Sequence, residues 1–211
     1  YFDDAVHGKR FIKLGARPII HLWASRLIRG DRFQEVSDQV RSFAYLIGSE
    51  FDWNGPVRPY LKEVIAGLDA ITDYGSYIPS FAAASQSRLD DSYVERVLAL
   101  ERMWQSWLVL NSPTTALMPA MTFAYRDRKG NPDLTSSRPE ACHLAESLYD
   151  FVVTLRSTVA VLGGIMIASY NEHYEGSSIE PTQEYGSLYL DIMREVFGPN
   201  ASGRCFTQAL R

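Results

Sequence analysis

Three residues in the C-terminal half of the chain have the types and the spacing of metal ligands. Glu140, His143 and Glu146 follow one another at intervals of three, and residues three apart share one face of a helix. Carboxylate and imidazole groups that converge there could hold iron or manganese, with a position left open for oxygen or a small substrate. The spacing therefore raises the hypothesis of a metal-dependent helical enzyme.

A structural interpretation explains the same residues more simply. Ser137 and Glu140 form the capping-box pattern of a helix start, and His143 and Glu146 continue a polar stripe beside a separate apolar face. Bundles that bind two metal ions need a Glu-x-x-His pair on each of two helices, and this chain has one such pair. We therefore expect these side chains to face solvent, and we expect no cofactor.

A second polar cluster has the composition of an acid–base site. His173 lies between Glu172 and Glu175 in the segment NEHYE, and a histidine in a loop among carboxylates could transfer protons. An exposed loop is the simpler interpretation. The chain has no G-x-S-x-G turn, glycine-rich phosphate loop or Cys-x-x-Cys pair, so none of the familiar catalytic motifs is present. Its two cysteines, Cys142 and Cys205, are expected to be reduced.

Basic residues gather near the start of the chain, at Lys9, Arg10, Lys13 and Arg17. They could contact phosphate groups, which keeps a helical RNA-binding protein as an alternative. Over the whole chain, however, 21 Lys and Arg stand against 25 Asp and Glu, a net charge of −4. A solvated face is the simpler interpretation of the cluster.

Large aromatic residues fall mainly in segments that lack helical periodicity. Tyrosine and tryptophan combine apolar area with a polar tip, so such residues often anchor contacts between proteins. The interface candidates are Trp53, Tyr60, Tyr77, Phe81, Phe123 and Tyr125. The competing interpretation is that these rings cover the core beneath long loops.

The elements that must position these residues are predicted to be mostly helices. Apolar residues at steps of three and four, with capping and stop residues at the ends, predict helices over residues 16–30, 31–48, 59–75, 92–111, 137–164 and 181–198. The second half of 137–164 is rich in β-branched residues and is an alternative buried strand. Residues 112–138 lack helical signal and are predicted to be an extended arm or loop.

These elements predict a mainly α, bundle-like single domain over residues 1–211, or an excerpt of a longer chain, with a short β-like arm. An apolar fraction of 46% supports one substantial core. The predicted function is that of a non-catalytic, self-associating scaffold such as a coat or shell subunit, forming a homo-oligomer through its loops and arm. No secretion signal is visible, so a cytoplasmic location is expected, and residues 151–169 are interpreted as a buried helix that does not span a membrane.

Overall fold

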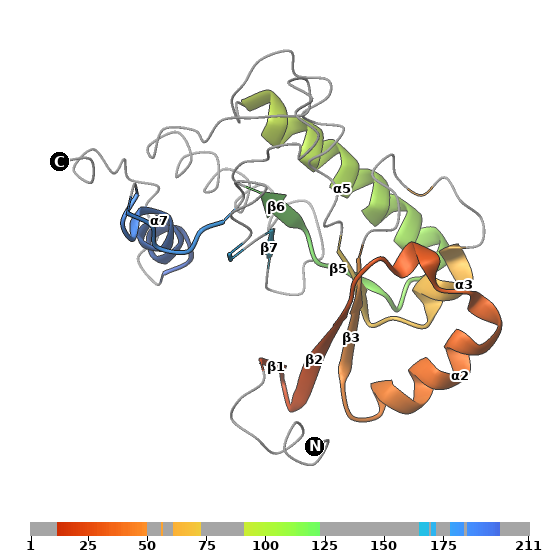
Figure 1. Ribbon diagram of the computed structural model, residues 1–211. Helices are drawn as coiled ribbons and strands as arrows, with labels where there is room; N and C mark the ends of the chain where they lie inside the picture. Colours follow the sequence, from red (N-terminus) through yellow and green to blue (C-terminus); the bar gives the residue numbers. More distant parts are fainter. Residues whose placement is uncertain are drawn as a thin grey trace. The chain divides into compact units, whose positions relative to one another are not determined.

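The computed structural model describes residues 12–49, 56, 61–72, 91–122, 165–168, 170–171, 178–183 and 185–198. Two compact units make up the chain. The first comprises Tyr1–Gly75, Leu100–Pro119 and Ala160–Met166, and the second comprises Ser76–Ala99, Ala120–Val159 and Ile167–Arg211. Figure 1 shows the elements, coloured along the sequence.

A five-stranded sheet organises the first unit (Figure 1). In both spatial and sequence order its strands are β1 (Lys13–Leu14), β2 (Arg17–Leu22), β3 (Tyr45–Gly48), β4 (Ala70–Ile71) and β5 (Ala116–Leu117). β1 is antiparallel to β2, whereas β2, β3, β4 and β5 are each parallel to their neighbours. Parallel neighbours in chain order, joined through helices, are the building pattern of α/β barrels.

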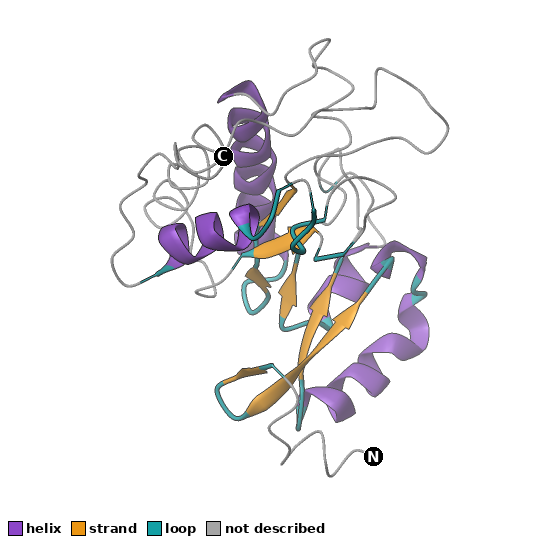
Figure 2. Cartoon of the chain, turned by 60° about the vertical axis from the view of Figure 1, so that its left-hand side comes forward, coloured by secondary structure: helices purple, strands orange, loops and turns teal. Residues whose placement is uncertain are grey.

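Helices connect the parallel strands. The 3-10 helix η1 (Ser25–Leu27) and the helix α2 (Gly30–Arg41) lead from β2 to β3, α3 (Leu61–Ala66) leads into β4, and α5 (Asp91–Asn111) precedes β5. α2 packs on both α3 and β3, and Figure 2 shows α2 and α3 along the same side of the strands. The sheet therefore has one face that is covered by helices.

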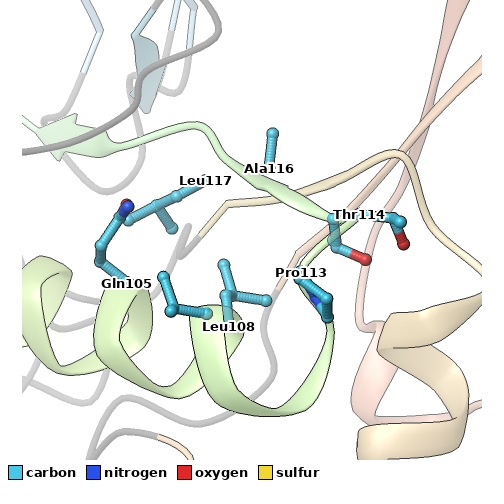
Figure 3. Close-up of a pocket in the computed structure, with 8 residues that line it drawn as sticks. Gln105, Leu108, Pro113, Thr114, Ala116 and Leu117 are labelled. Carbon is cyan, nitrogen blue, oxygen red and sulfur yellow. The ribbon is translucent and has the colours of Figure 1, made fainter.

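The opposite face of the sheet, here called the inner face, carries its own apolar cluster. Tyr45, Ile47 and Ala70 are buried there, and side chains alternate between the two faces along each strand. Partly buried apolar residues around them are Leu14, Ile19, Ala116 and Met118. Leu117 points the other way, toward Leu108 of α5 (Figure 3). Alternation thus assigns each strand residue to the inner face or to the helix-covered face.

The second unit contains a two-stranded sheet and one long described helix. β6 (Ala120–Thr122) pairs with β7 (Met166–Ala168). α7 (Leu188–Phe197) buries Leu188, Tyr189, Ile192 and Val196. Before it, Thr182 and Gly186 close a tight turn through reciprocal backbone hydrogen bonds of 3.2 and 2.8 Å, and Gly186 supplies the positive φ of 53° that this turn uses.

The predicted helical bundle is wrong. Residues 16–30 form β2 and η1, the predicted helix 31–48 stops at Arg41 and is followed by β3, and the predicted helix 59–75 is α3 followed by β4. The predicted arm after residue 112 begins with β5, a member of the parallel sheet. Strands buried on both faces read as short apolar runs without alternation, which periodicity alone does not separate from pieces of a helix.

The predicted helix over 92–111 is confirmed, because α5 spans Asp91–Asn111 and buries Val97, Leu100 and Trp104. The predicted helix over 181–198 is confirmed only in its second half, because α7 begins at Leu188, after the turn at Thr182 and Gly186, and ends before Gly198. The predicted helix over 137–164 and its alternative, a buried strand in the second half, both lie outside the described residues. Met166–Ala168, at the end of the segment 151–169 that was interpreted as a buried helix, form the strand β7 instead. None of the helices that the structure describes combines the length and the hydropathy needed to cross a bilayer.

Gly67 allows α2 and α3 to pack closely, and its substitution should destabilise the first unit. A Cβ atom at this position would stand 2.8 Å from Cε1 of Phe33 and 2.8 Å from Oγ of Ser37, both on α2. Gly67→Ala is therefore expected to lower the free energy of unfolding by about 1–3 kcal/mol, the usual range for overpacking. Urea unfolding monitored by tryptophan fluorescence measures the change.

Val36→Ala is a suitable control, because Val36 lies on the same helix and is 55% exposed. Its effect should stay within about 0.5 kcal/mol, as is usual for surface sites. Equal free energies of unfolding for the Gly67→Ala variant and the unmodified chain would show that α2 can move to make room for the added Cβ atom without destabilising the fold.

Candidate active site

The carboxyl ends of β2, β3 and β4 place a set of polar and aromatic residues along one edge of the sheet. Trp23, Ala24 and Ser25 follow β2, Ser49 follows β3, and Thr72 follows β4. In barrel and open α/β folds, substrates bind at the carboxyl ends of parallel strands. These five residues, here called the carboxyl edge, are therefore the first place to look for a site.

Two buried serines hold this edge together and are used for structure. Ser25 donates its backbone N–H to the Ser49 carbonyl at 2.8 Å, and the Ser49 N–H donates to the Leu22 carbonyl at 3.0 Å. The Ser25 hydroxyl donates to the same Leu22 carbonyl at 2.8 Å. Both serines are fully buried. They tie the turn after β2 to β3 and are not placed to act as nucleophiles.

Ala24, which lies between the exposed Trp23 and the buried Ser25, has a strained backbone. Ala24 has φ 53° and ψ 41°, a left-handed conformation that costs a non-glycine residue about 1–2 kcal/mol. Trp23, just before it, is 65% exposed. An exposed indole offers a broad apolar surface with one N–H donor, which suits the C–H face of a ring-shaped polar ligand. Backbone strain of this kind tends to occur at functional positions.

The inner face is apolar along its middle and carries two polar side chains near the carboxyl edge. Thr72 follows Ala70 on the inner face by alternation, and its Oγ1 is buried without a hydrogen-bond partner. His21 shares the inner face with Ile19, and its Cα partner on β3 is Ile47. Its side chain is exposed, yet partial loss of hydration lowers its pKa below the usual 6.5. At neutral pH this imidazole is therefore uncharged and offers one donor and one acceptor.

An ion-pair cluster lies at the amino ends of the strands, opposite the carboxyl edge. Oδ1 of Asp69 lies 3.3 Å from Nη1 of Arg17 and 3.3 Å from Nε of Arg41, while its Oδ2 accepts the Leu46 N–H at 2.9 Å. The Arg17 guanidinium also lies 4.9 Å from the centroid of the Tyr45 ring. Polar networks at the amino ends of barrel strands serve stability, whereas catalytic groups lie at the other end. This cluster is accordingly assigned to the scaffold.

Tyr45 makes stability depend on pH above about 10. Burial, followed by the charge of Asp69, raises its pKa to about 12, against the opposing effects of Arg17 and Arg41. An unfolded tyrosine releases its proton near pH 10. Between pH 10 and 12 the unfolded chain has thus lost a proton that the native chain retains, so stability that is fully present below pH 10 falls as pH rises.

We expect the free energy of unfolding to fall by about 1 kcal/mol more between pH 9 and pH 11 for the unmodified chain than for Tyr45→Phe. Urea titrations of both proteins at the two pH values measure this difference, and other tyrosines cancel in the comparison. Parallel pH dependence in the two proteins would mean that Tyr45 titrates like an exposed phenol.

A cavity of about 250 Å³ lies between α5 and β5 (Figure 3). Its walls are formed by Gln105, Leu108, Val109, Pro113, Thr114, Thr115, Ala116 and Leu117. The cavity lies against α5, the loop after it and β5, and its volume is below the range of most ligand pockets. It is therefore not the candidate site.

The structure describes few of the residues that the sequence singled out. Lys13 and Arg17 lie on β1 and β2, and Arg17 Nη1 is engaged by Asp69 and by the Arg41 carbonyl at 3.0 Å. The other candidates, which lie outside the described residues, are Lys9, Arg10, Trp53, Tyr60, Tyr77, Phe81, Phe123, Tyr125, Glu140, His143 and Glu146. Among the residues that the structure does describe, no three His, Cys, Asp or Glu side chains gather as metal ligands.

Sequence reasoning did not single out Trp23, Thr72 or His21. The available signal was position, because Trp23 and Thr72 come directly after apolar runs that prove to be parallel strands. That signal has meaning only after those runs are recognised as strands.

Comparison with solved structures identifies the architecture. The chain is similar to a glycoside hydrolase-like protein, with a TM-score of 0.67 and 19% identity over 92% of this chain and 58% of the other. It is also similar to two structures of the GH99 endo-α-mannosidase of Bacteroides thetaiotaomicron. One, in complex with bis-tris propane, has a TM-score of 0.54 and 17% identity over 81% of this chain and 49% of that one. The other has a TM-score of 0.57 and 15% identity over 93% and 60%.

The chain thus spans between about half and three fifths of the length of these proteins. No protein-family model matches it, and no curated protein does. The likeness contradicts the predicted coat or shell subunit with a helical core, because these structures and the five-stranded sheet show a different fold. The two alternatives also assumed a helical fold. The fold is that of glycoside hydrolase-like proteins.

Proposed function

We propose that this chain belongs to a glycoside hydrolase and that α-linked mannosides are the first substrate class to test. The carboxyl edge supports the proposal most directly. It combines an exposed indole, a strained backbone and a buried unpaired hydroxyl at the end of a parallel sheet, where enzymes with this architecture bind their substrates. The similar structures supply the reaction class, since two of them are described as endo-α-mannosidases.

Hydrolysis of a glycosidic bond usually needs two carboxyl groups. One protonates the oxygen of the leaving sugar, and the other activates water or attacks the anomeric carbon. Glu172 and Glu175 are the candidates that we propose, because they lie on either side of His173 and in sequence follow β7. Both lie outside the described residues, so their selection rests on sequence position alone.

His173 lies between the two glutamates. Its imidazole could orient one carboxyl group or carry a proton to it. The segment was first interpreted as an exposed loop. Its place after a strand of a glycosidase-like fold now favours the acid–base interpretation.

A hydrolysis assay tests the proposal. The purified chain is incubated with α-1,2- and α-1,3-linked mannobiose, with yeast α-mannan, and with cellobiose as a β-linked comparison. New reducing ends and product masses are then measured. Release of shorter α-mannosides, absent after heat denaturation, is the expected result. Failure to cleave any of these saccharides would overturn the proposal, and cleavage of cellobiose alone would overturn the choice of α-mannosides.

A further inference from the structure

Trp23 differs from the other tryptophans that the structure describes, because its side chain is exposed. Its exposed fraction is 65%, whereas Trp104 is 1% exposed. Trp104 packs edge-on against Trp107 of the same helix, α5, with ring centroids 6.0 Å apart. The first unit can therefore bury an indole, and the exposure of Trp23 needs an explanation of its own.

The hydrogen bonds around Ser49 show that the end of β2 contains an extra residue. β2 and β3 keep a regular register as far as Leu22 and Gly48, and the Ser49 N–H donates to the Leu22 carbonyl at 3.0 Å. In a regular parallel ladder the Ser49 carbonyl would accept the N–H of Ala24. It accepts the N–H of Ser25 instead, at 2.8 Å. Trp23 and Ala24 thus stand together opposite Ser49, which is the pattern of a β-bulge.

This bulge makes the exposure of Trp23 a fixed feature of the fold. Bulges redirect side chains and are frequent next to active sites. Here the bulge includes the left-handed backbone of Ala24. The chain is anchored on both sides, by Leu22 in β2 and by Ser25, which is buried and hydrogen-bonded through its N–H and its hydroxyl group. A ring on so well held a backbone loses little conformational entropy when a ligand covers it.

We propose that Trp23 stacks against the C–H face of one sugar unit in a bound saccharide. The face of an indole carries negative charge density, whereas the C–H hydrogens of a pyranose are partly positive because each carbon bears an oxygen. Contact also removes apolar surface of the ring from water. Trp23 follows the carboxyl end of β2, and barrel enzymes bind their substrates at this end of the strands.

This inference rests on the proposed glycoside hydrolase function. It adds to that function the residue of the first unit that holds a sugar ring.

Trp23→Ala and Trp23→Phe test the contact with α-1,2- and α-1,3-linked mannobiose and with cellobiose. Isothermal titration calorimetry measures the affinity, and KM and kcat are measured for any disaccharide that is cleaved. Trp23→Ala should weaken binding of the best-bound disaccharide about tenfold, because the apolar contact and the ring face are both lost. Trp23→Phe should weaken it about threefold, because a smaller ring face remains. Such a loss raises KM and leaves kcat unchanged.

Leu110→Ala is the matched control, because Leu110 is 81% exposed and lies on α5 in the same unit. It should keep the affinity of the unmodified chain. Trp23→Ala should also keep the urea midpoint of the unmodified chain, since an exposed side chain contributes little to packing. Weaker binding together with a lower midpoint would show that Trp23 supports the fold, and would overturn its assignment to sugar binding.

Acrylamide quenching of tryptophan fluorescence reports directly on the ring. A saturating concentration of the best-bound disaccharide should reduce quenching in the unmodified chain, because the sugar covers Trp23. This protection should be lost in Trp23→Phe. Protection of the same size in Trp23→Phe would mean that the sugar covers a different tryptophan, and the proposal would be wrong.

The outcomes also separate this inference from the proposed function. If the chain binds or cleaves a disaccharide and Trp23→Ala binds it equally well, the stacking contact is wrong while the proposed function stands. If the unmodified chain neither binds nor cleaves any of the three disaccharides, both proposals are wrong.

Discussion

Glu172→Gln and Glu175→Gln are each expected to lower kcat for cleavage of the best substrate by about 10³-fold, within the usual range for loss of a general acid or base. Glutamine keeps the size and the hydrogen-bonding capacity of glutamate but cannot exchange a proton at neutral pH. Steady-state release of reducing ends measures the loss. The matched control is Glu35→Gln, because Glu35 is an exposed residue of α2 and should retain full activity.

The leaving group distinguishes the roles of the two glutamates. A 4-nitrophenyl α-mannoside departs with little need for protonation, so the variant that lacks the general acid should retain much of its activity on this substrate. The variant that lacks the other carboxylate should be inactive on both kinds of substrate. Full activity of both variants on mannobiose would remove this segment from the catalytic mechanism.

Asp69→Ala should lower the free energy of unfolding by about 2–4 kcal/mol, the largest stability effect expected in the first unit. Asp69 is 9% exposed, and its removal leaves two guanidinium groups and the Leu46 N–H without their carboxylate. Water reaches part of the Arg17 and Arg41 side chains, which are 37% and 25% exposed. This solvation keeps the expected loss below that of a fully buried pair.

Asp191→Asn is the control for Asp69→Ala, since Asp191 also contacts an arginine, Arg194, at 2.6 Å but with a side chain that is 40% exposed. Its loss should cost less than about 1 kcal/mol, as is usual for surface pairs. Urea unfolding of both variants measures the difference. Equal losses would contradict a scaffold role for the cluster at the amino ends of the strands.

The long helices could be predicted from the sequence, whereas the sheet could not. α5 repeats apolar residues such as Val97, Leu100 and Trp104 over several turns, so its period is unambiguous. β3 is four residues long and buried throughout. It follows α2 so closely that Ile47 continues the helical spacing that begins at Phe33. With helix and strand merged in this way, the alternation of α and β elements was hidden.

The candidate site was only partly predictable for a related reason. The sequence drew attention to Glu172, His173 and Glu175 through composition and spacing alone. Thr72 and His21 have no such local pattern, because their significance depends on strand alternation and on the direction of the strands. The metal, interface and RNA-contact residues outside the described part of the chain stay predictions, and so does a homo-oligomer.

The order of pairing in the sheet determines how this chain folds. β2, β3 and β4 come from neighbouring parts of the sequence, but β5 adds to β4 by pairing residue 116 with residue 70. Closing so long a loop is entropically slow. We therefore expect a three-stranded nucleus to form first during synthesis on the ribosome, with the free side of β4 exposed until β5, which follows α5, has emerged. Misassembly and binding by chaperones should therefore occur mainly in the time between the synthesis of β4 and the synthesis of β5.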